Sequence, residues 1–319
     1  HVKVAKPTGS ATISATEFQV LLLANMNELA PTGLDVLKAE KTAAITTFNT
    51  KEVGQSYLPM HSDVLTVMGL TPVKEEANGT KTHHLNWYKN NSSCVVSDTP
   101  TDGTHVTTVP DGVGKVIMTR SISRVQFTSL KSNFTAQYAG VTFKIDSIYL
   151  ANVRNNATVM GEEDTEADYF RGGPVEFAVI QGLIDPEANV NASFAKTYET
   201  PLVLSSESGE LDATALGFDK YINANQPEYA EEDGYLTRLL ITGTLMDGDR
   251  ELGKKYFHIP LKLVDDTGNV ASNKFFKISA TITGEGSPNP DEILENACIN
   301  FSIEVAPWNV VEQTEEDTN

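Results

Sequence analysis

Apolar and polar residues alternate most regularly near the C-terminal end of this chain. The alternation predicts a β-strand with one buried face. The apolar positions are Ala297, Ile299, Phe301, Ile303 and Val305. After them comes Pro307, which cannot donate a ladder hydrogen bond, and the next apolar residues, Trp308 and Val310, fall on the opposite parity. We therefore predict two short strands joined by a kink, which either complete the chain's own sheet or add to the sheet of a neighbouring molecule.

Most other apolar segments also have the pattern of strands. The exception is 25–49, where apolar residues at spacings of three and four predict a helix. Its periodic positions are Leu34, Leu37, Lys41, Ala44, Ile45 and Phe48. A phase break at Ser147 predicts a β-bulge, and Pro260 predicts an edge strand or a bulge. The predicted extended segments are 18–24, 58–60, 64–68, 116–127, 141–150, 236–245, 256–263, 276–282 and 297–305.

Strands separated by turn signals favour an all-β fold over a βαβ architecture. The acidic run 161–168 and the Gly172-Gly-Pro174 turn place a domain boundary near residue 160. We predict two β-sandwich domains, 1–160 and 161–319, with one short helix in the first.

The charge balance excludes one class of partner. The 319 residues include 43 Asp and Glu against 24 Lys and Arg, a formal net charge of −19, so we expect no nucleic acid partner. The apolar runs are far shorter than the roughly 20 residues that span a bilayer. No signal-peptide pattern begins at His1, so we expect any export signal to have been removed.

Catalytic motifs are missing from the pattern. The sequence shows no nucleophile elbow, P-loop, dinucleotide fingerprint or Cys-x-x-Cys pair, so we expect no catalytic residue and no cofactor. A degradative enzyme ranks third among the functions we consider, after the two described at the end of this subsection, because scattered carboxylates could form a catalytic pair that the sequence does not reveal.

Two kinds of residue cluster could bind a metal ion. His83 and His84, with His105 downstream, would face opposite ways on a strand, and the acidic segments 161–168 and 265–269 do not have EF-hand spacing. We expect surface histidines and solvated acidic loops rather than metal sites.

Four further residues leave alternatives open. We expect Cys94 and Cys298 to be free thiols, with a disulfide as the alternative. For Arg120 and Arg124 we expect aliphatic stems along the sheet with charged heads in water, and an ion pair across the domain contact as the alternative. Trp87-Tyr88 is the one candidate aromatic platform for a sugar.

Several segments, taken in order, form a pattern that extends from about residue 18 to the end of the chain. They are 20–29 with the helix after it, 58–60, 120–125, 148–152, 255–260, 274–290 and 301–308. The most specific part is the strand followed by a Thr283-Gly284 loop and the Val305-x-x-Trp308 ending. This pattern resembles the fimbrillins, the major fimbrial subunit family of the type V pili of Bacteroidales.

The resemblance implies two transthyretin-like β-sandwich domains, no catalysis, and export as a lipoprotein to the outer membrane. In this family a protease cleaves after a basic residue and removes an N-terminal strand, and the C-terminal strands of another subunit fill the groove that is left. The side chains that would fill it here are Ala297, Ile299, Phe301, Ile303, Val305, Trp308 and Val310.

The chain departs from the family pattern in two places. Residues 1–17 are small and polar where the family has a further apolar strand pair, so either the chain is shortened or these strands have diverged. Lys3 and Lys6 are then the candidate cleavage positions. Ser272-Asn273 stands where the family has Arg-Asn.

We therefore expect a structural subunit of a cell-surface pilus that polymerises by protease-triggered strand exchange. Its partners would be copies of itself or related pilins, with host or bacterial surface ligands in addition. A shaft subunit is preferred over a tip protein because the terminal strand suits a donor. The competing class is a monomeric surface adhesin or glycan-binding module that uses the loops around Trp87.

Overall fold

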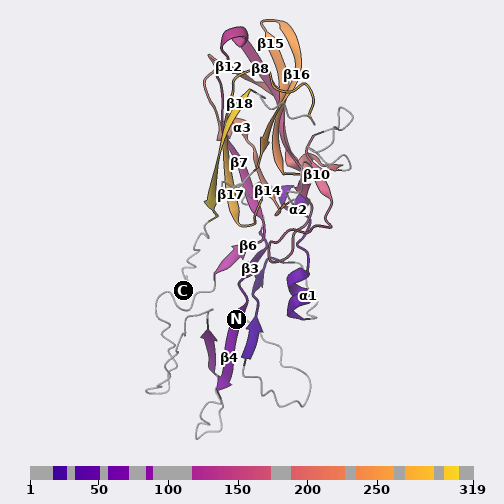
Figure 1. The fold of residues 1–319 in the computed structure, drawn as a ribbon, viewed down its shortest axis with the longest axis vertical. Helices are drawn as coiled ribbons and strands as arrows, with labels where there is room; N and C mark the ends of the chain where they lie inside the picture. Colours follow the sequence, from indigo (N-terminus) through magenta and orange to yellow (C-terminus); the bar gives the residue numbers. More distant parts are fainter. Residues whose placement is uncertain are drawn as a thin grey trace, which may run out of the picture. The chain divides into compact units, whose positions relative to one another are not determined.

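The computed structural model describes most of the second half of the chain and several shorter stretches of the first. The described residues are 17–26, 33–50, 57–71, 84–88, 117–173, 188–226, 235–261, 270–290 and 298–308. Within them the secondary structure is mainly β-strand, and the few helices are short (Figure 1). The predicted all-β class is confirmed.

One large sheet has four antiparallel strands in the order β12-β8-β15-β16. Its strands are β8 (Val141–Ala151), β12 (Ala195–Ser205), β15 (Arg238–Asp247) and β16 (Arg250–Pro260). Because β16 is an edge strand, Pro260 at its end leaves no inner ladder position without a donor. The edge position predicted from Pro260 is confirmed.

The predicted bulge is present in β8. Thr242 of β15 lies opposite Ser147, and the next residue, Gly243, lies opposite Ile145, so Asp146 is the extra residue. A Cβ atom at Gly243 would lie 2.1 Å from the carbonyl oxygen of Lys144. Only glycine therefore fits opposite the bulge.

The second large sheet has the order β13-β7-β17-β18, with β14 also paired to β7. Parallel pairing joins β7 to β17, whereas β18 runs antiparallel to β17. The strands are β7 (Ser123–Ser132), β13 (Leu211–Asp212), β14 (Asp219–Ile222), β17 (Lys274–Ile282) and β18 (Ile299–Pro307).

The two large sheets share one hydrophobic core. Alternate residues of β7, β8 and β17 are fully or almost fully buried, as a half-buried strand requires. Phe143 of β8 meets Phe257 of β16 edge to face, with 5.2 Å between ring centroids. Each such side chain contributes about 1.5–3 kcal/mol when fully buried. The inner face of the sheet that carries β18 is therefore the face that packs against this core.

The predicted single helix over 25–49 is wrong. The structure has two short helices, α1 (Leu34–Ala39) and α2 (Ile45–Asn49), separated by an extended segment. In that segment the N–H of Thr42 donates to the carbonyl of Ala157 at 2.8 Å, and Lys41 forms an isolated antiparallel β-bridge with Thr158. Pairing with a distant loop thus replaces helical hydrogen bonds in the middle of the periodic stretch.

The remaining elements are small. They comprise β1 (Glu17–Val20), β2 (Leu23–Ala24), β3 (Met60–Ser62), β4 (Leu65–Thr71), β5 (His84–Tyr88), β6 (Met118–Arg120), β9 (Val153–Arg154), β10 (Tyr169–Arg171), β11 (Asn189–Val190), α3 (Ala213–Leu216), η1 (Ala136–Tyr138) and η2 (Ala192–Phe194). They form three-stranded sheets with the orders β1-β4-β5, β2-β3-β6 and β11-β10-β9. Within the described ranges, no helix has the length and apolar character needed to cross a membrane.

The chain divides into two compact units. One contains 1–22 and 62–118, and the other contains 23–61 and 119–319. Strands on both sides of residue 160 share sheets, because β8 pairs with β12 and β15, and β7 pairs with β14 and β17. The division in the structure therefore differs from the predicted boundary at residue 160.

Candidate functional site: the C-terminal strand and its contacts

The strand predicted near the C-terminal end is β18, and it lies along one side of β17. Nine residue pairs join the two strands in a single register, from Ile282 opposite Ile299 to Lys274 opposite Pro307. Among the described strands β18 pairs with β17 alone, so it is an edge strand. In this structure the strand is therefore part of the chain's own sheet.

The apolar face of β18 is only partly covered. Ile299, Ile303 and Val305 are partly buried and pack against the core. Phe301 lies opposite Ala280 and remains 43% exposed. Ala297 and Val310, the other residues predicted to fill a partner's groove, lie outside the described residues. The structure thus places four of the seven predicted donor residues along one strand face and Trp308 just beyond it.

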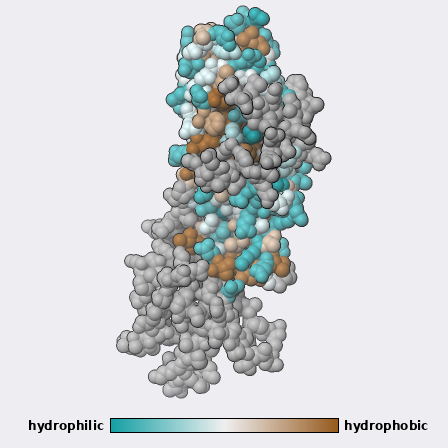
Figure 2. Space-filling model, viewed as in Figure 1, coloured by the Kyte–Doolittle hydropathy of each residue, from teal (hydrophilic) through white to brown (hydrophobic). Residues whose placement is uncertain are grey.

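Hydrophobic side chains also reach the surface elsewhere in the described part of the chain. Figure 2 shows such residues, in brown, among the hydrophilic ones on one face of the molecule. The large exposed hydrophobic residues are Val36, Tyr57, Ile117, Val190, Val203 and Phe301. Of these, Phe301 is the one that belongs to the predicted donor strand.

The outer face of β18 is polar. Asn300, Ser302 and Glu304 are exposed, and the Glu304 carboxylate accepts a hydrogen bond from Lys277 Nζ across the strand pair at 3.0 Å. An ion pair as exposed as this one contributes about 0–1 kcal/mol. The side chains of this outer face therefore contribute little to the stability of the β17–β18 pairing.

Trp308 fastens the end of the strand by other means. Pro307 is the last residue of β18, and the Trp308 N–H makes one more bond of the ladder, to the carbonyl of Asn273 at 3.3 Å. The Arg120 guanidinium donates to the Trp308 carbonyl at 2.9 Å and lies 4.5 Å from the centre of its ring. The indole also stacks on Tyr221, with 5.8 Å between centroids and 20° between planes. Partial burial lowers the pKa of Arg120 from its usual value.

Tyr221, which lies under Trp308, is itself held from the other side. Its N–H donates to Asn49 Oδ1 at 2.8 Å, and its carbonyl accepts from Asn49 Nδ2 at 2.8 Å. Tyr221 belongs to β14 and is 1% exposed, whereas Asn49 is the last residue of α2. The side-chain amide of Asn49 thus occupies the place of a strand partner beside β14.

The expected exposure of the two arginine heads is wrong in this structure. Arg124 makes a bidentate contact with Asp219, with Nε to Oδ1 at 2.9 Å and Nη2 to Oδ2 at 2.5 Å. Its guanidinium also lies 4.5 Å from the centre of the Phe275 ring. The hydrogen bonds with Asp219 raise the pKa of Arg124. Arg120 and Arg124 are therefore both bound, and both contacts lie within the larger compact unit.

The loop before β18 is attached to β16. Lys255 pairs with Glu285, and this hydrogen bond lowers the pKa of Glu285. Ser287 and Tyr256 exchange two backbone hydrogen bonds of 2.8 and 2.9 Å. Cys298 carries a free thiol, and Cys94 lies outside the described residues. The loop is therefore bound independently of β18.

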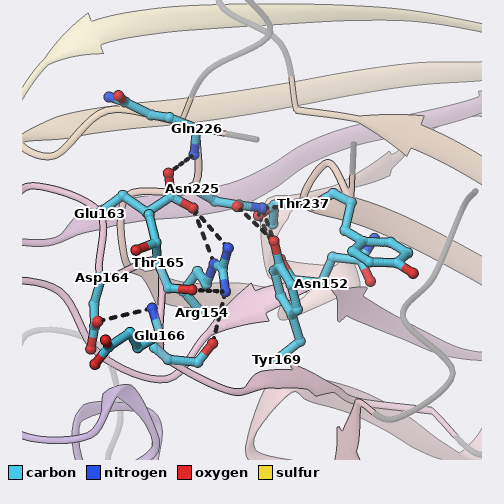
Figure 3. A network of polar contacts seen from close by, with 12 residues as sticks. Asn152, Arg154, Glu163, Asp164, Thr165, Glu166, Tyr169, Asn225, Gln226 and Thr237 are labelled. Carbon is cyan, nitrogen blue, oxygen red and sulfur yellow. Dashed lines mark hydrogen bonds and ion pairs between the residues drawn. The ribbon is translucent and has the colours of Figure 1, made fainter. Parts of the chain in front are cut away.

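The acidic run 161–168 is only in part the solvated loop that we expect from sequence. Glu163 accepts from Arg154 Nε at 3.1 Å and from the Gln226 N–H at 3.1 Å (Figure 3). Asp164 pairs with Lys41 Nζ at 2.8 Å and is 8% exposed. The two carboxylates thus already have cationic partners from the chain.

Neutral side chains continue the same network. The Asn225 amide donates to the carbonyls of Asn152 and Tyr235 at 3.2 and 2.8 Å and to Thr237 Oγ1 at 2.9 Å (Figure 3). These contacts join strand ends on either side of the acidic run. The network therefore connects the segment after β14 to the ends of β8 and β15.

The other predicted metal candidates fall mainly outside the described residues. His84 belongs to β5, but His83, His105 and 265–269 are not described. In the part of the chain that the structure describes, no group of three or more potential ligands could hold a metal ion. Trp87 and Tyr88 lie on β5, with Trp87 opposite Val67.

Comparison with known proteins gives a family match and several similar folds. Residues 1–120 match the model of the family described as major fimbrial subunit protein (FimA). No curated protein matches the chain. A fimbrilin (FimA) from Porphyromonas gingivalis superposes with a TM-score of 0.60 at 18% identity, over 92% of this chain and 81% of that one.

A second solved structure is similar to the same extent. This protein from Parabacteroides distasonis, whose description proposes a role in cell adhesion, has a TM-score of 0.57 at 16% identity, over 92% of this chain and 84% of that one. The resemblance deduced from sequence is therefore confirmed: residues 1–120 match the FimA major fimbrial subunit family, and the chain has the fold of a fimbrillin.

Proposed function

We propose that this protein is a structural subunit of a cell-surface fimbrium. The proposal is supported by the family match of residues 1–120 and by the fimbrillin-like fold of the chain. Other copies of the chain or related pilins are its partners. Export as a lipoprotein and assembly at the outer membrane belong to the same proposal and come from the family resemblance.

The subunit polymerises by donating β18 to the next subunit. The observation that carries this step is the position of β18, an edge strand with its apolar face partly uncovered. An edge strand can leave without breaking a ladder on both sides, because only one row of backbone hydrogen bonds must be replaced. Strand addition to a neighbour would restore that row.

Burial gives the exchange a favourable direction. Full burial of a large apolar side chain is worth about 1.5–3 kcal/mol, and Phe301 is 43% exposed in its own subunit. A closed groove in a neighbour would complete the burial of Phe301 and of the partly buried Ile299, Ile303 and Val305. The contacts of β18 with β17 would be lost in the exchange and replaced by contacts in the groove. The net gain in free energy therefore comes from the apolar surface of β18 that is exposed to water in its own subunit.

A charge placed at Phe301 tests the donation. In Phe301→Asp the carboxylate can reach water while the strand is in its own sheet, but it would be buried without a partner in a groove. We expect the variant to fold and to form no polymer after treatment with trypsin, which cleaves after basic residues. Asn300→Asp, which adds the same charge to the exposed face, should polymerise like the wild type.

Gel electrophoresis without boiling shows the outcome as a ladder of oligomers. A ladder of normal intensity from Phe301→Asp would contradict donation of β18. A wild-type chain that never forms a ladder but binds a glycan, with binding lost in Trp87→Ala, would favour the monomeric adhesin instead. A point substitution is sharper here than removal of 297–319, because β18 also covers part of the core.

A further inference from the structure

We propose that Trp308, Arg120 and Tyr221 form a clasp that controls how readily β18 leaves its own subunit. This inference rests on the proposed donation of β18 and adds its regulation. The clasp consists of the indole of Trp308, the Arg120 guanidinium 4.5 Å from the centre of the indole ring, and the Tyr221 ring stacked on the indole.

The rest of β18 is held by contacts that are incomplete. The strand has a ladder on one side only, its exposed pair Lys277–Glu304 is screened by water, and Phe301 is not fully covered. Strand ends open first in such an arrangement, since fraying needs the fewest broken hydrogen bonds. The contacts at the C-terminal end therefore decide how often β18 opens.

The clasp lies where the ladder stops. The backbone of Pro307 faces away from β17, so its missing N–H breaks no ladder bond. Trp308 makes the last ladder bond to Asn273, accepts a hydrogen bond from the Arg120 side chain and adds two ring contacts. Aromatic stacking and a cation over an indole are each stronger than an exposed ion pair when they are partly shielded from water. Within the described part of the chain, no residue of β18 itself makes a cation–π or ring-stacking contact.

Tyr221 and Asn273, which contact Trp308, are hydrogen-bonded to other parts of the same unit. Tyr221 is fixed by the two hydrogen bonds to Asn49. Asn273 donates its N–H to the Ile122 carbonyl at 3.1 Å, and the next N–H, of Lys274, donates to Ser123 Oγ at 2.9 Å. Trp308 therefore docks against a surface that does not have to be ordered when the strand returns.

Arg120 belongs to β6 and not to the donated strand. A substitution at Arg120 therefore changes how strongly β18 is bound in its own subunit without changing the residues that would enter the next subunit. Arg120→Gln weakens the hold on Trp308 and leaves every side chain of the donor unchanged. Trp308→Ala removes the clasp from the side of the strand. If the clasp controls release, the two variants must open β18 alike in the isolated subunit, and Arg120→Gln must donate it faster.

Hydrogen–deuterium exchange of the amides in 299–306 measures opening without any need for polymer. We expect exchange to rise about tenfold or more in both variants, and less than about threefold in Lys277→Gln, which removes only the exposed pair. Circular dichroism checks that the variants are folded. Unchanged exchange in both folded variants would overturn the clasp.

Polymerisation is measured on the same proteins after trypsin treatment. A ladder that forms several-fold faster in Arg120→Gln than in the wild type supports the clasp, and an unchanged rate despite faster exchange overturns its control of release. If exchange rises but no ladder forms from any protein, the clasp on β18 stands and the proposed strand donation fails.

Discussion

The side-chain amide of Asn49 pairs with the backbone of Tyr221 through two hydrogen bonds of 2.8 Å, although the residues are 172 positions apart. Both residues are buried. The pair satisfies an N–H and a carbonyl on the side of β14 that faces away from β7. A single side chain thus ties α2 to the sheet that carries β18.

We predict that Asn49→Ala lowers the free energy of unfolding by about 2–4 kcal/mol. The substitution leaves a buried N–H and a buried carbonyl of Tyr221 without a partner, and each such group costs about 1–3 kcal/mol. Urea denaturation measures the loss. Thr47→Ala, on the exposed side of the same helix, should change stability by less than about 0.5 kcal/mol. Equal losses in the two variants would show that the paired amide has no special role.

A second consequence concerns His258, which is buried in β16 at 4% exposure. Burial lowers its pKa to about 3, and the nearby charge of Arg238 acts in the same direction. The unfolded chain, with a histidine pKa near 6.5, therefore binds a proton at a pH where the folded chain does not. Stability from this residue is fully present above pH 6.5 and is lost as the pH falls toward the folded pKa.

As the pH falls from 7 to 5, His258 becomes protonated in the unfolded chain but not in the folded one. We predict that this lowers the free energy of unfolding by about 2 kcal/mol, since each pH unit below 6.5 costs about 1.4 kcal/mol. His258→Gln should lose less stability over that interval than the wild type. The difference between the two proteins is the quantity to measure by urea denaturation, because carboxylates affect both in the same way. Parallel pH profiles for the two would contradict the account.

Alternating patterns were sufficient to predict β7, β8, β15, β16, β17 and β18, but no extended segment was predicted over β12 or β14 of the same unit. The inner face of β18 and the bulge in β8 follow from the parity of residues such as Ile303 and Ser147, because side-chain direction in a strand has a period of two. Local pattern failed at 40–44, where pairing with the distant loop around Ala157 replaced helix. Periodicity carries no information about such a partner.

The contacts at the site escaped prediction for the same reason. Trp308 is visible in the sequence as an apolar residue after a proline, but its partner Arg120 lies 188 positions away. Likewise Glu163 and Asp164 appear solvated until Arg154 and Lys41 are brought to them. The domain boundary was misplaced because strands from both sides of residue 160 enter the same sheets. An acidic, glycine-containing segment signals a loop, whether or not a domain ends there.

A reversible crosslink between β17 and β18 tests the central claim most directly. Lys277 and Glu304 lie opposite each other on the exposed face, and directly opposed antiparallel residues have the Cα spacing that a disulfide needs. Lys277→Cys with Glu304→Cys, in a chain where Cys94 and Cys298 are changed to Ser, would lock β18 in its own subunit. The measurement is ladder formation after trypsin treatment, with and without reductant. We predict no ladder from the oxidised protein and a normal ladder once it is reduced, whereas equal ladders in both states would contradict donation of β18.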